Sequence, residues 1–311
     1  MEKNDVSYDF KELNDSNIED LCTSFNSVRK KNKSLSYFSK KYDSSWTGKK
    51  VYLGYLIFSK ERAAGFCGST IYKLKSNERG EYFFSQFSDL YLDSELRGKG
   101  VINEVLAAFE SLARLKKLEG VFVFPRLHTL SIFEKAQWKH IGNFQTYSFN
   151  VKTYPLLKLL NKLGKQELFF YFGKLFGSTE LSKIEKKNIS TDKMTVVHDE
   201  LFFKYKKYKR FLFHKYKNIE FLWNLSDGII INSLQVESEE ELKDLINFLK
   251  GFCFIRGIHS FKIICHDRSS LSHLLSKKYK GVTSLPILIK SFNPEIDIDA
   301  IEFQGIDRND F

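Results

Sequence analysis

Four residues at the joint between two segments have the chemistry of a phosphate site. The stretch FSDLYLDSELRGKGVINEVLAAFESLARLKK, residues 87–117, begins like a strand and ends like an amphipathic helix, with Arg97, Gly98, Lys99 and Gly100 between them. Backbone N–H groups in a helix's first turn converge on one point, where the helix dipole adds positive charge. The glycines open the backbone to a ligand, and the cations add fixed charge. The joint predicts an anion site, with a plain surface turn as the alternative.

Two common nucleotide-binding motifs are absent from this joint. A P-loop needs the pattern G-x-x-x-x-G-K-[ST], which does not occur there. A dinucleotide fingerprint needs glycine or alanine three residues after Gly100, where Asn103 stands. The joint therefore belongs to neither of these two kinds of nucleotide site.

Hydrophobic periodicity places the joint inside an α/β unit. In its first half the chain predicts strands at 51–58, 64–74 and 82–92, a helix at 99–117, a strand at 120–124, a helix at 129–136 and a strand at 141–149. The last hundred residues repeat this order, with strands at 220–226 and 228–236, a helix at 238–257, a strand at 260–266, a helix at 269–279 and a strand at 285–292. We expect domains at 1–152 and 201–311, joined by a helical and basic connector at 153–200.

Composition bounds the class of protein. A chain of 311 residues with 42% hydrophobic residues is long enough for two domains that each bury a core. The four cysteines lie far apart and form no C-x-x-C pair, which predicts reduced thiols and no metal site. The acidic, polar N-terminus and the lack of about 20 consecutive apolar residues predict a cytoplasmic protein. A net charge of +11 favours an anionic partner without choosing its kind.

The joint resembles the pyrophosphate loop of the GNAT superfamily of acyl-CoA N-acyltransferases, which reads [RQ]-x-x-G-x-[GA] between a strand and the next helix. The segment LRGKGVI supplies this pattern from Arg97 to Val101, and Ile102 stands where glycine or alanine is usual. Downstream, RLHTLSIFEKAQW follows the superfamily spacing N-x-x-[AS]-x-x-x-Y-x-K-x-G-F, with Arg126, Phe133 and Gln137 in place of the asparagine, tyrosine and glycine.

Residues 50–150 look most like bacterial double-GNAT proteins associated with surface-polysaccharide biosynthesis, in which a degenerate second half follows an intact first half. The resemblance implies an α/β fold of two GNAT-like domains in tandem, each a mixed, mostly antiparallel twisted sheet flanked by helices. The second half resembles the family by architecture alone, since it has no R-x-x-G-x-G of its own.

The resemblance also implies which residues bind the cofactor. Acetyl-CoA or another acyl-CoA would be the co-substrate, with its thioester arm along one strand and its pyrophosphate on the loop N–H groups. The expected cofactor-binding residues are Leu90, Tyr91, Leu92, Arg97, Gly98, Lys99, Gly100, Val101, Ile102 and Phe133.

Three residues are candidates for the chemistry of amine acylation. Asp89 lies eight residues before Arg97 on the strand expected beside the thioester, and we expect it to accept the amine proton; a solvated strand residue or a cap is the alternative. Phe133 replaces the family tyrosine and can only pack. The acid for the leaving thiolate would then be Tyr91 or His128, although a histidine at a helix start is commonly structural.

A basic and aromatic run extends from Phe202 to Lys217, with seven cations interleaved with seven aromatic residues. It could track tRNA while stacking on bases, or lie on an anionic membrane surface. The alternative is an amphipathic segment that buries its aromatic residues in the second domain and exposes its lysines.

The resemblance implies an enzyme, an N-acyltransferase that moves an acyl group, with acetyl expected, from acyl-CoA to an amine of a small molecule or an envelope sugar precursor. Three alternatives remain at this point. One is an aminoacyl-tRNA-dependent transferase like the Fem enzymes of the peptidoglycan bridge. The others are a catalytically degenerate acyl-CoA-binding protein, and a nucleic-acid or membrane-surface module that uses the basic run alone.

Overall fold

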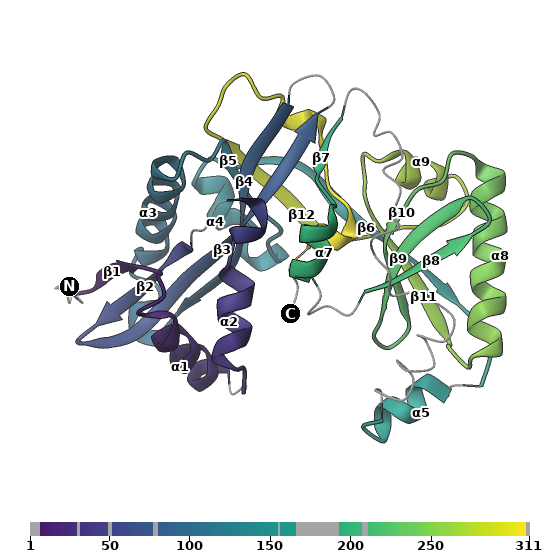
Figure 1. The fold of residues 1–311 in the computed structure, drawn as a ribbon, viewed down its shortest axis with the longest axis horizontal. Coiled ribbons are helices and arrows are strands. Elements are labelled where there is room, and N and C mark those ends of the chain that lie inside the picture. The colour runs from purple at the N-terminus through teal and green to yellow at the C-terminus, as the bar shows by residue number, and fades with distance from the viewer. Residues whose placement is uncertain are drawn as a thin grey trace. The chain divides into compact units, whose positions relative to one another are not determined.

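A computed structural model of the chain describes residues 7–29, 32–48, 52–76, 80–154, 156–165, 193–206 and 211–308. Contacts between Cα atoms divide it into two units. Unit 1 is built mainly from Met1–Ile141 and Ile287–Ala300, and unit 2 from Gly142–Pro286 and Ile301–Asn309. Each unit has its own strands, helices and hydrophobic core (Figure 1).

Unit 1 contains a sheet in the order β1-β2-β3-β4-β5-β12. Neighbouring strands are antiparallel, except that β4 and β5 are parallel. The strands are β1 (Asp9–Glu12), β2 (Leu53–Ser59), β3 (Arg62–Ser76), β4 (Gly80–Leu92), β5 (Gly120–Val123) and the last part of β12 (Val282–Ser291). The helices are α1 (Ile18–Arg29), α2 (Leu35–Tyr42), α3 (Val101–Leu115) and α4 (Leu130–Lys135).

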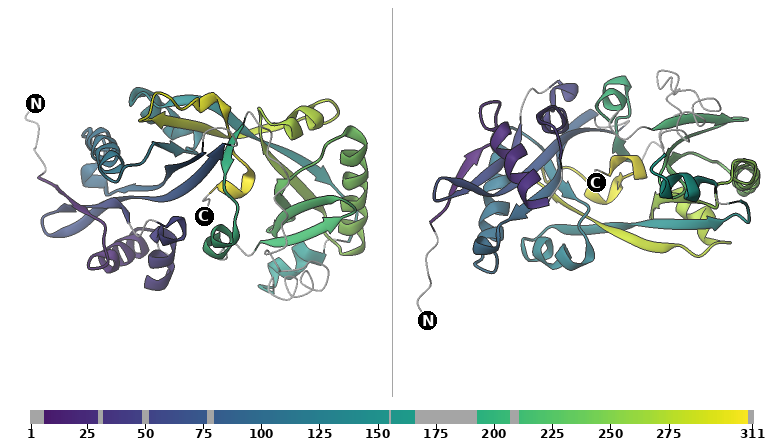
Figure 2. Two further views of the ribbon diagram at one scale, coloured as in Figure 1. Left: turned by 45° about the horizontal axis from the view of Figure 1, so that its top comes forward. Right: turned by 90° about the horizontal axis from the view of Figure 1, so that it is seen from below.

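Helices cover both faces of this sheet (Figure 1 and Figure 2). On one face, the buried residues of α3, such as Val105 and Phe109, pack on β3 and β4 residues such as Cys67. On the other face, α1 and α2 contribute Leu21 and Phe38 to a second cluster. Strand residues alternate between the two clusters because successive strand side chains point to opposite faces.

Unit 2 repeats this plan with a sheet in the order β6-β11-β10-β9-β8. Its strands β10 and β11 are parallel, and the other neighbours are antiparallel. The strands are β6 (Lys139–Asn150), β8 (Leu212–Tyr216), β9 (Ile219–Leu225), β10 (Ile229–Leu234) and β11 (Ser260–His266). Two short strands outside this order, β7 (Met194–Val196) and β13 (Ile301–Glu302), pair in parallel. The helices are α5 (Leu156–Lys162), α7 (Glu200–Lys206), α8 (Glu239–Ile255) and α9 (Ser270–Ser276).

The two series of elements match, but their last strands are exchanged. The order β2-β3-β4-α3-β5-α4-β6 corresponds to β8-β9-β10-α8-β11-α9-β12. Strand β12 pairs with β5 through Leu288–Ser291, and β6 pairs with β11 through Phe144–Asn150. The contact-based units therefore differ from the expected domains 1–152 and 201–311, because 142–150 belongs to unit 2 and 287–300 to unit 1.

The predicted fold class is confirmed, since each unit is a mixed, mostly antiparallel sheet with flanking helices. The strands and helices expected over 51–149 and 220–292 occur in the predicted order with small differences at their ends. The elements β1, α1, α2, β7, β8 and β13 were not predicted. Most of the connector expected at 153–200, residues 166–192, lies outside the described residues.

Candidate active site

Asp89 follows a β-bulge in β4 that decides which way its side chain points. In the β3–β4 ladder Gly68 pairs with Asp89 and Ser69 with Phe87, so Ser88 is an extra residue on β4. One extra residue exchanges the two faces of a strand. Phe87 thus lies in the core with α3, whereas Asp89, two residues later, contacts α2 on the other face.

Three donors hold one oxygen of the Asp89 carboxylate. The Lys41 ammonium pairs with Oδ2, the Tyr42 hydroxyl donates to it at 2.7 Å and the Ser88 hydroxyl at 3.2 Å. The Lys41 and Asp89 side chains are only 3% and 9% exposed. Oδ1 accepts no hydrogen bond from the part of the chain that the structure describes. The carboxylate is therefore fixed by one oxygen and has its other oxygen available.

Gly68 makes room for this arrangement. A Cβ at Gly68 would lie 2.5 Å from Cε1 of Tyr42 and 3.0 Å from its hydroxyl. The Tyr42 ring therefore lies against the backbone of β3, opposite Asp89, because residue 68 has no side chain. Helix α2 is held in place at its start by its cap Ser34, and at its end by the Thr70 hydroxyl, which donates to the Lys41 carbonyl at 3.2 Å.

Burial changes the acid–base behaviour of Lys41. It lowers the pKa of this amine from 10.5 to about 8, and the nearby Asp89 opposes the shift only in part. Lys41 therefore gives up its proton at a lower pH than an exposed lysine does. The site combines a fixed carboxylate with a second group that can change charge.

The pairing between strands β4 and β5 ends three residues before Asp89. Their parallel pairing runs through Phe84–Gly120, Ser85–Val121 and Gln86–Phe122 and then ends, although β4 continues to Leu92. Beyond Gln86 this edge of β4 has no strand beside it among the described residues. Backbone N–H and C=O groups on such an edge can bind an extended ligand. This is the segment, Leu90 to Leu92, expected to align the thioester arm.

The loop after β4 has the geometry of an open anion site. Gly98 and Gly100 have φ of 75° and 82°, which favours glycine, and a Cβ on either would meet no atom within 4 Å. Gly100 is the N-cap of α3, so the first N–H groups of that helix follow it. Arg97 braces the loop, because its Nε donates to the Leu92 carbonyl at 2.7 Å. Lys99 is exposed.

No protein-family model matches the chain, and no curated protein sequence matches it. Solved structures do match it over most of its length. A conserved protein from Enterococcus faecalis has a TM-score of 0.62 at 10% identity, covering 92% of this chain and 73% of its own. A GCN5-related N-acetyltransferase from Kribbella flavida has a TM-score of 0.58 at 11% identity, covering 92% and 71%. The chain has the fold of the GCN5-related N-acetyltransferases.

N-myristoyltransferase of Saccharomyces cerevisiae, solved with bound myristoyl-CoA, is similar over 91% of this chain and 82% of its own, with a TM-score of 0.52 at 11% identity.

On this acetyltransferase fold, the remaining predicted site residues take different positions. Tyr91 is buried beside α1 and α2, and its hydroxyl donates to Asp93 at 3.2 Å; burial and then the Asp93 charge raise the pKa of the phenol. His128 is exposed in a short 3-10 helix before α4. Val101 is buried and Ile102 half-buried in the first turn of α3. The roles assigned to these residues stay predictions.

Phe133 lies in the core of unit 1. Its side chain is 4% exposed, and its ring centroid lies 5.8 Å from that of Phe87 and 5.2 Å from that of Trp138. The ring therefore packs, as its missing hydroxyl led us to expect. Its role as a cofactor contact stays a prediction.

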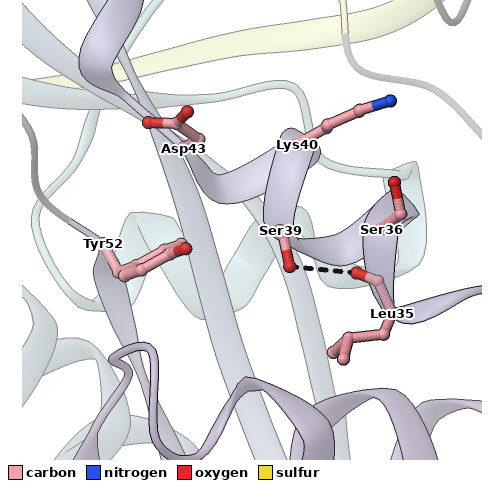
Figure 3. Close-up of a pocket in the computed structure, with 6 residues that line it drawn as sticks. All are labelled: Leu35, Ser36, Ser39, Lys40, Asp43 and Tyr52. Carbon is pink, nitrogen blue, oxygen red and sulfur yellow. Dashed lines mark hydrogen bonds between the residues drawn. The ribbon is translucent and has the colours of Figure 1, made fainter.

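Sequence reasoning missed Lys41 and Tyr42. Nothing in the segment around them distinguishes them from other lysines and tyrosines of the chain, and only the docking of α2 on β3 brings them to Asp89. On its outer side α2 borders a shallow depression of about 450 Å³ (Figure 3). That depression is lined by Leu35, Ser36, Ser39, Lys40, Asp43 and Tyr52, none of which contacts the Asp89 carboxylate.

About half of the described residues in the basic and aromatic run of 202–217 are buried. Phe202, Phe203, Phe211 and Phe213 are buried, and so is Lys206, whose Nζ donates to the Arg308 carbonyl at 3.3 Å. Residues 207–210 lie outside the described residues. The four phenylalanines are unavailable for stacking on bases or for insertion into lipid, so the amphipathic, aromatic-burying interpretation is confirmed for them.

Membrane spans and metal clusters are both absent from the described residues. None of their helices is both long enough and apolar enough to cross a bilayer. Within the same residues no group of three histidine, cysteine, aspartate or glutamate side chains lies within reach of one metal ion. The four cysteines are free thiols, and burial raises the pKa of Cys67, Cys253 and Cys265 to about 12.

Proposed function

We propose that the protein is an acyltransferase that moves an acyl group from acyl-CoA to an amine bound at Asp89. The observation that carries this proposal is the order of features along β4 and α3. A carboxylate with one available oxygen is followed by an open strand edge, and then by a loop with two left-handed glycines before a helix. The fold of the solved acetyltransferases is consistent with it.

The geometry suggests how the chain would bind acyl-CoA. The N–H groups that follow Gly98 and Gly100 would hold the pyrophosphate, with Lys99 adding charge. The open edge of β4 after Gln86 would hold the pantetheine arm by backbone hydrogen bonds. A backbone N–H of that edge would then polarise the thioester carbonyl.

The reaction needs a neutral amine beside this carbonyl. Oδ1 of Asp89 would accept a proton or a hydrogen bond from the amine, while Lys41, Tyr42 and Ser88 keep the carboxylate from rotating. The amine nitrogen forms a bond to the acyl carbon, and the carbon–sulfur bond breaks. The thiolate then takes up a proton, for which Tyr91 and His128 stay the predicted donors.

Isothermal titration calorimetry with acetyl-CoA and longer acyl-CoA molecules tests the binding step. Gly100→Glu should abolish binding, since it adds a negative side chain to the anion site. Gly48→Glu is the matched control, because Gly48 has φ of 83°, is exposed, and a Cβ added to it would likewise meet no atom within 4 Å. Equal loss of binding in both variants, or no binding by the wild type, would contradict the proposal.

Asp89→Asn tests the catalytic step. Loss of a general base typically lowers the rate about 10²–10⁴-fold. The acyl-CoA dissociation constant should stay within about threefold, because the predicted cofactor contacts are backbone groups and loop residues. Full turnover by Asp89→Asn would show that the amine proton leaves by another route.

We infer the finer assignments from the sequence resemblance and keep them as part of this proposal. They are an acetyl donor, an amine of a small molecule or envelope sugar precursor as acceptor, a double-GNAT protein of surface-polysaccharide biosynthesis, and a cytoplasmic location. Mass spectrometry of the products from a panel of amino sugars and small amines with acetyl-CoA tests the acceptor class. The buried phenylalanines of 202–217 give no support to tRNA as a partner.

A further inference from the structure

An exposed apolar patch lies on unit 2 where α5 meets the end of α8. Six of the eleven large hydrophobic side chains that are exposed among the described residues belong to it: Tyr154, Leu156, Leu159, Leu163, Phe254 and Ile255. Their exposed fractions range from 43% at Leu156 to 83% at Tyr154. We name these six residues the α5–α8 patch. Such a concentration of exposed apolar side chains marks an interaction site more often than chance exposure does.

Backbone contacts make the two segments one continuous surface. The Thr153 hydroxyl donates to the Phe254 carbonyl at 2.8 Å, and the Leu157 N–H donates to the Gly257 carbonyl at 3.3 Å. A Cβ on Gly257 would lie only 2.6 Å from Cβ of Leu156. Figure 1 shows α5 close to one end of α8.

The exposed leucines are not needed for the core. On α5, Leu157 is fully buried and Leu160 packs partly against the same cluster. Leu156, Leu159 and Leu163 stay on the outside of that helix and turn. At the end of α8, Phe252 and Cys253 fill the core while the next two residues, Phe254 and Ile255, are exposed. Each of the two segments therefore buries some of its apolar side chains in the core of unit 2 and exposes others to solvent.

The charges within the two segments that form the patch are all of one sign. Residues 151–165 contain four lysines and no acidic residue, and residues 245–266 contain no acidic residue either. The acidic residues of α8 are confined to 239–244, at its other end. Lys158 and Lys162 lie on α5 between the exposed leucines, and both are exposed.

We propose that the α5–α8 patch docks unit 2 on an anionic lipid bilayer. Leucine, phenylalanine and isoleucine side chains would enter the boundary between headgroups and acyl chains, and the lysines would reach the anionic headgroups. Tyr154 has the amphipathic ring that is enriched at this depth. A second copy of the chain fits less well, because the same patch on both copies would bring the lysines of one against those of the other. This inference does not depend on the acyltransferase proposal.

Vesicle flotation of the full chain tests the charge requirement. The wild type should float with vesicles of phosphatidylcholine and phosphatidylglycerol, float much less with phosphatidylcholine alone, and be released by salt. The double variant Lys158→Gln/Lys162→Gln should bind about 30-fold more weakly, since each cation near an anionic surface contributes about 1 kcal/mol. The control Lys75→Gln/Lys280→Gln has the same net charge and should bind within about twofold of the wild type.

Phe254→Ser/Ile255→Ser tests the apolar contribution. It should weaken vesicle binding at least about tenfold, because two large apolar side chains no longer leave water. Leu115→Ser is the control, since Leu115 is 74% exposed at the end of α3 and lies outside the patch. The proposal is overturned if the wild type does not bind anionic vesicles, or if both variants bind as well as their controls. It is also overturned if sedimentation velocity shows a dimer that Phe254→Ser/Ile255→Ser converts to a monomer.

Discussion

Replacing Lys41 by methionine should change how the stability of the protein depends on pH. An unfolded lysine keeps its proton up to its ordinary pKa of 10.5, whereas the folded protein lowers this pKa to about 8 by burial. Folding therefore releases a proton between pH 8 and pH 10.5, and the free energy of unfolding rises with pH in this window. The shift corresponds to about 3 kcal/mol, or about 1.4 kcal/mol for each pH unit.

The wild type alone would not reveal this contribution, because buried thiols act in the opposite direction. The pKa of Cys67, Cys253 and Cys265 is raised to about 12, so the folded state keeps protons that the unfolded state loses above about pH 9. The same thiols are present in Lys41→Met, so their contribution cancels when its free energy of unfolding is subtracted from that of the wild type. Urea unfolding followed by tryptophan fluorescence between pH 7 and pH 10 measures it.

Above pH 8, the free energy of unfolding of the wild type should rise relative to that of Lys41→Met by about 1.4 kcal/mol per pH unit. At pH 7 the variant should also be destabilised by about 3–5 kcal/mol, since it leaves the buried Asp89 carboxylate without its cation. Lys40→Met, at the neighbouring exposed position, should show neither effect. Parallel pH profiles for wild type and Lys41→Met would refute the buried ion pair as we describe it.

Three further outcomes are expected. Gly68→Ala should displace the Tyr42 ring, which lies 2.5 Å from the new Cβ, and lower turnover more than acyl-CoA affinity in steady-state kinetics and calorimetry. Phe133→Tyr should lower the free energy of unfolding by about 1–3 kcal/mol without raising turnover, because its hydroxyl would enter the core of unit 1 unpaired; a faster enzyme would mean that the phenol reaches the thiolate. Calorimetry should give one acyl-CoA per chain, since α8 begins with Glu239–Glu241 where α3 has glycines and cations, and a stoichiometry of two would contradict this.

The sequence predicts those parts of the fold that depend on neighbouring residues. Short runs rich in apolar and aromatic residues over 64–74 and 82–92 predict two strands from local sequence alone. The joint at 97–100 also depends on local sequence. Its glycines permit positive φ, and the helical spacing of apolar residues after Gly100 indicates where the helix begins. Both features occur in the structure as expected.

The site around Asp89 could not be predicted, because it depends on distant parts of the chain. Lys41 and Tyr42 reach the carboxylate from 48 and 47 residues away. The bulge at Ser88 reverses the faces of β4, and no residue type marks it. In the run 202–217, alternating cations and aromatic residues suit both a membrane helix and a buried segment. The packing partners of Phe202 and Phe203 decide between them.

The exchanged strands β6 and β12 have a consequence for how the protein is made. The sheet that presents Asp89 gains the neighbour of β5 from Leu288–Ser291, so a nascent chain cannot complete this sheet until residue 291 has left the ribosome. A fragment ending at residue 152 would leave β5 as a bare edge and β6 without β11, and such edges recruit other chains. The second half of the chain thus supplies strand β12, which pairs with β5 in the sheet of the first half. A gene coding for only one half would therefore yield aggregates rather than a smaller enzyme.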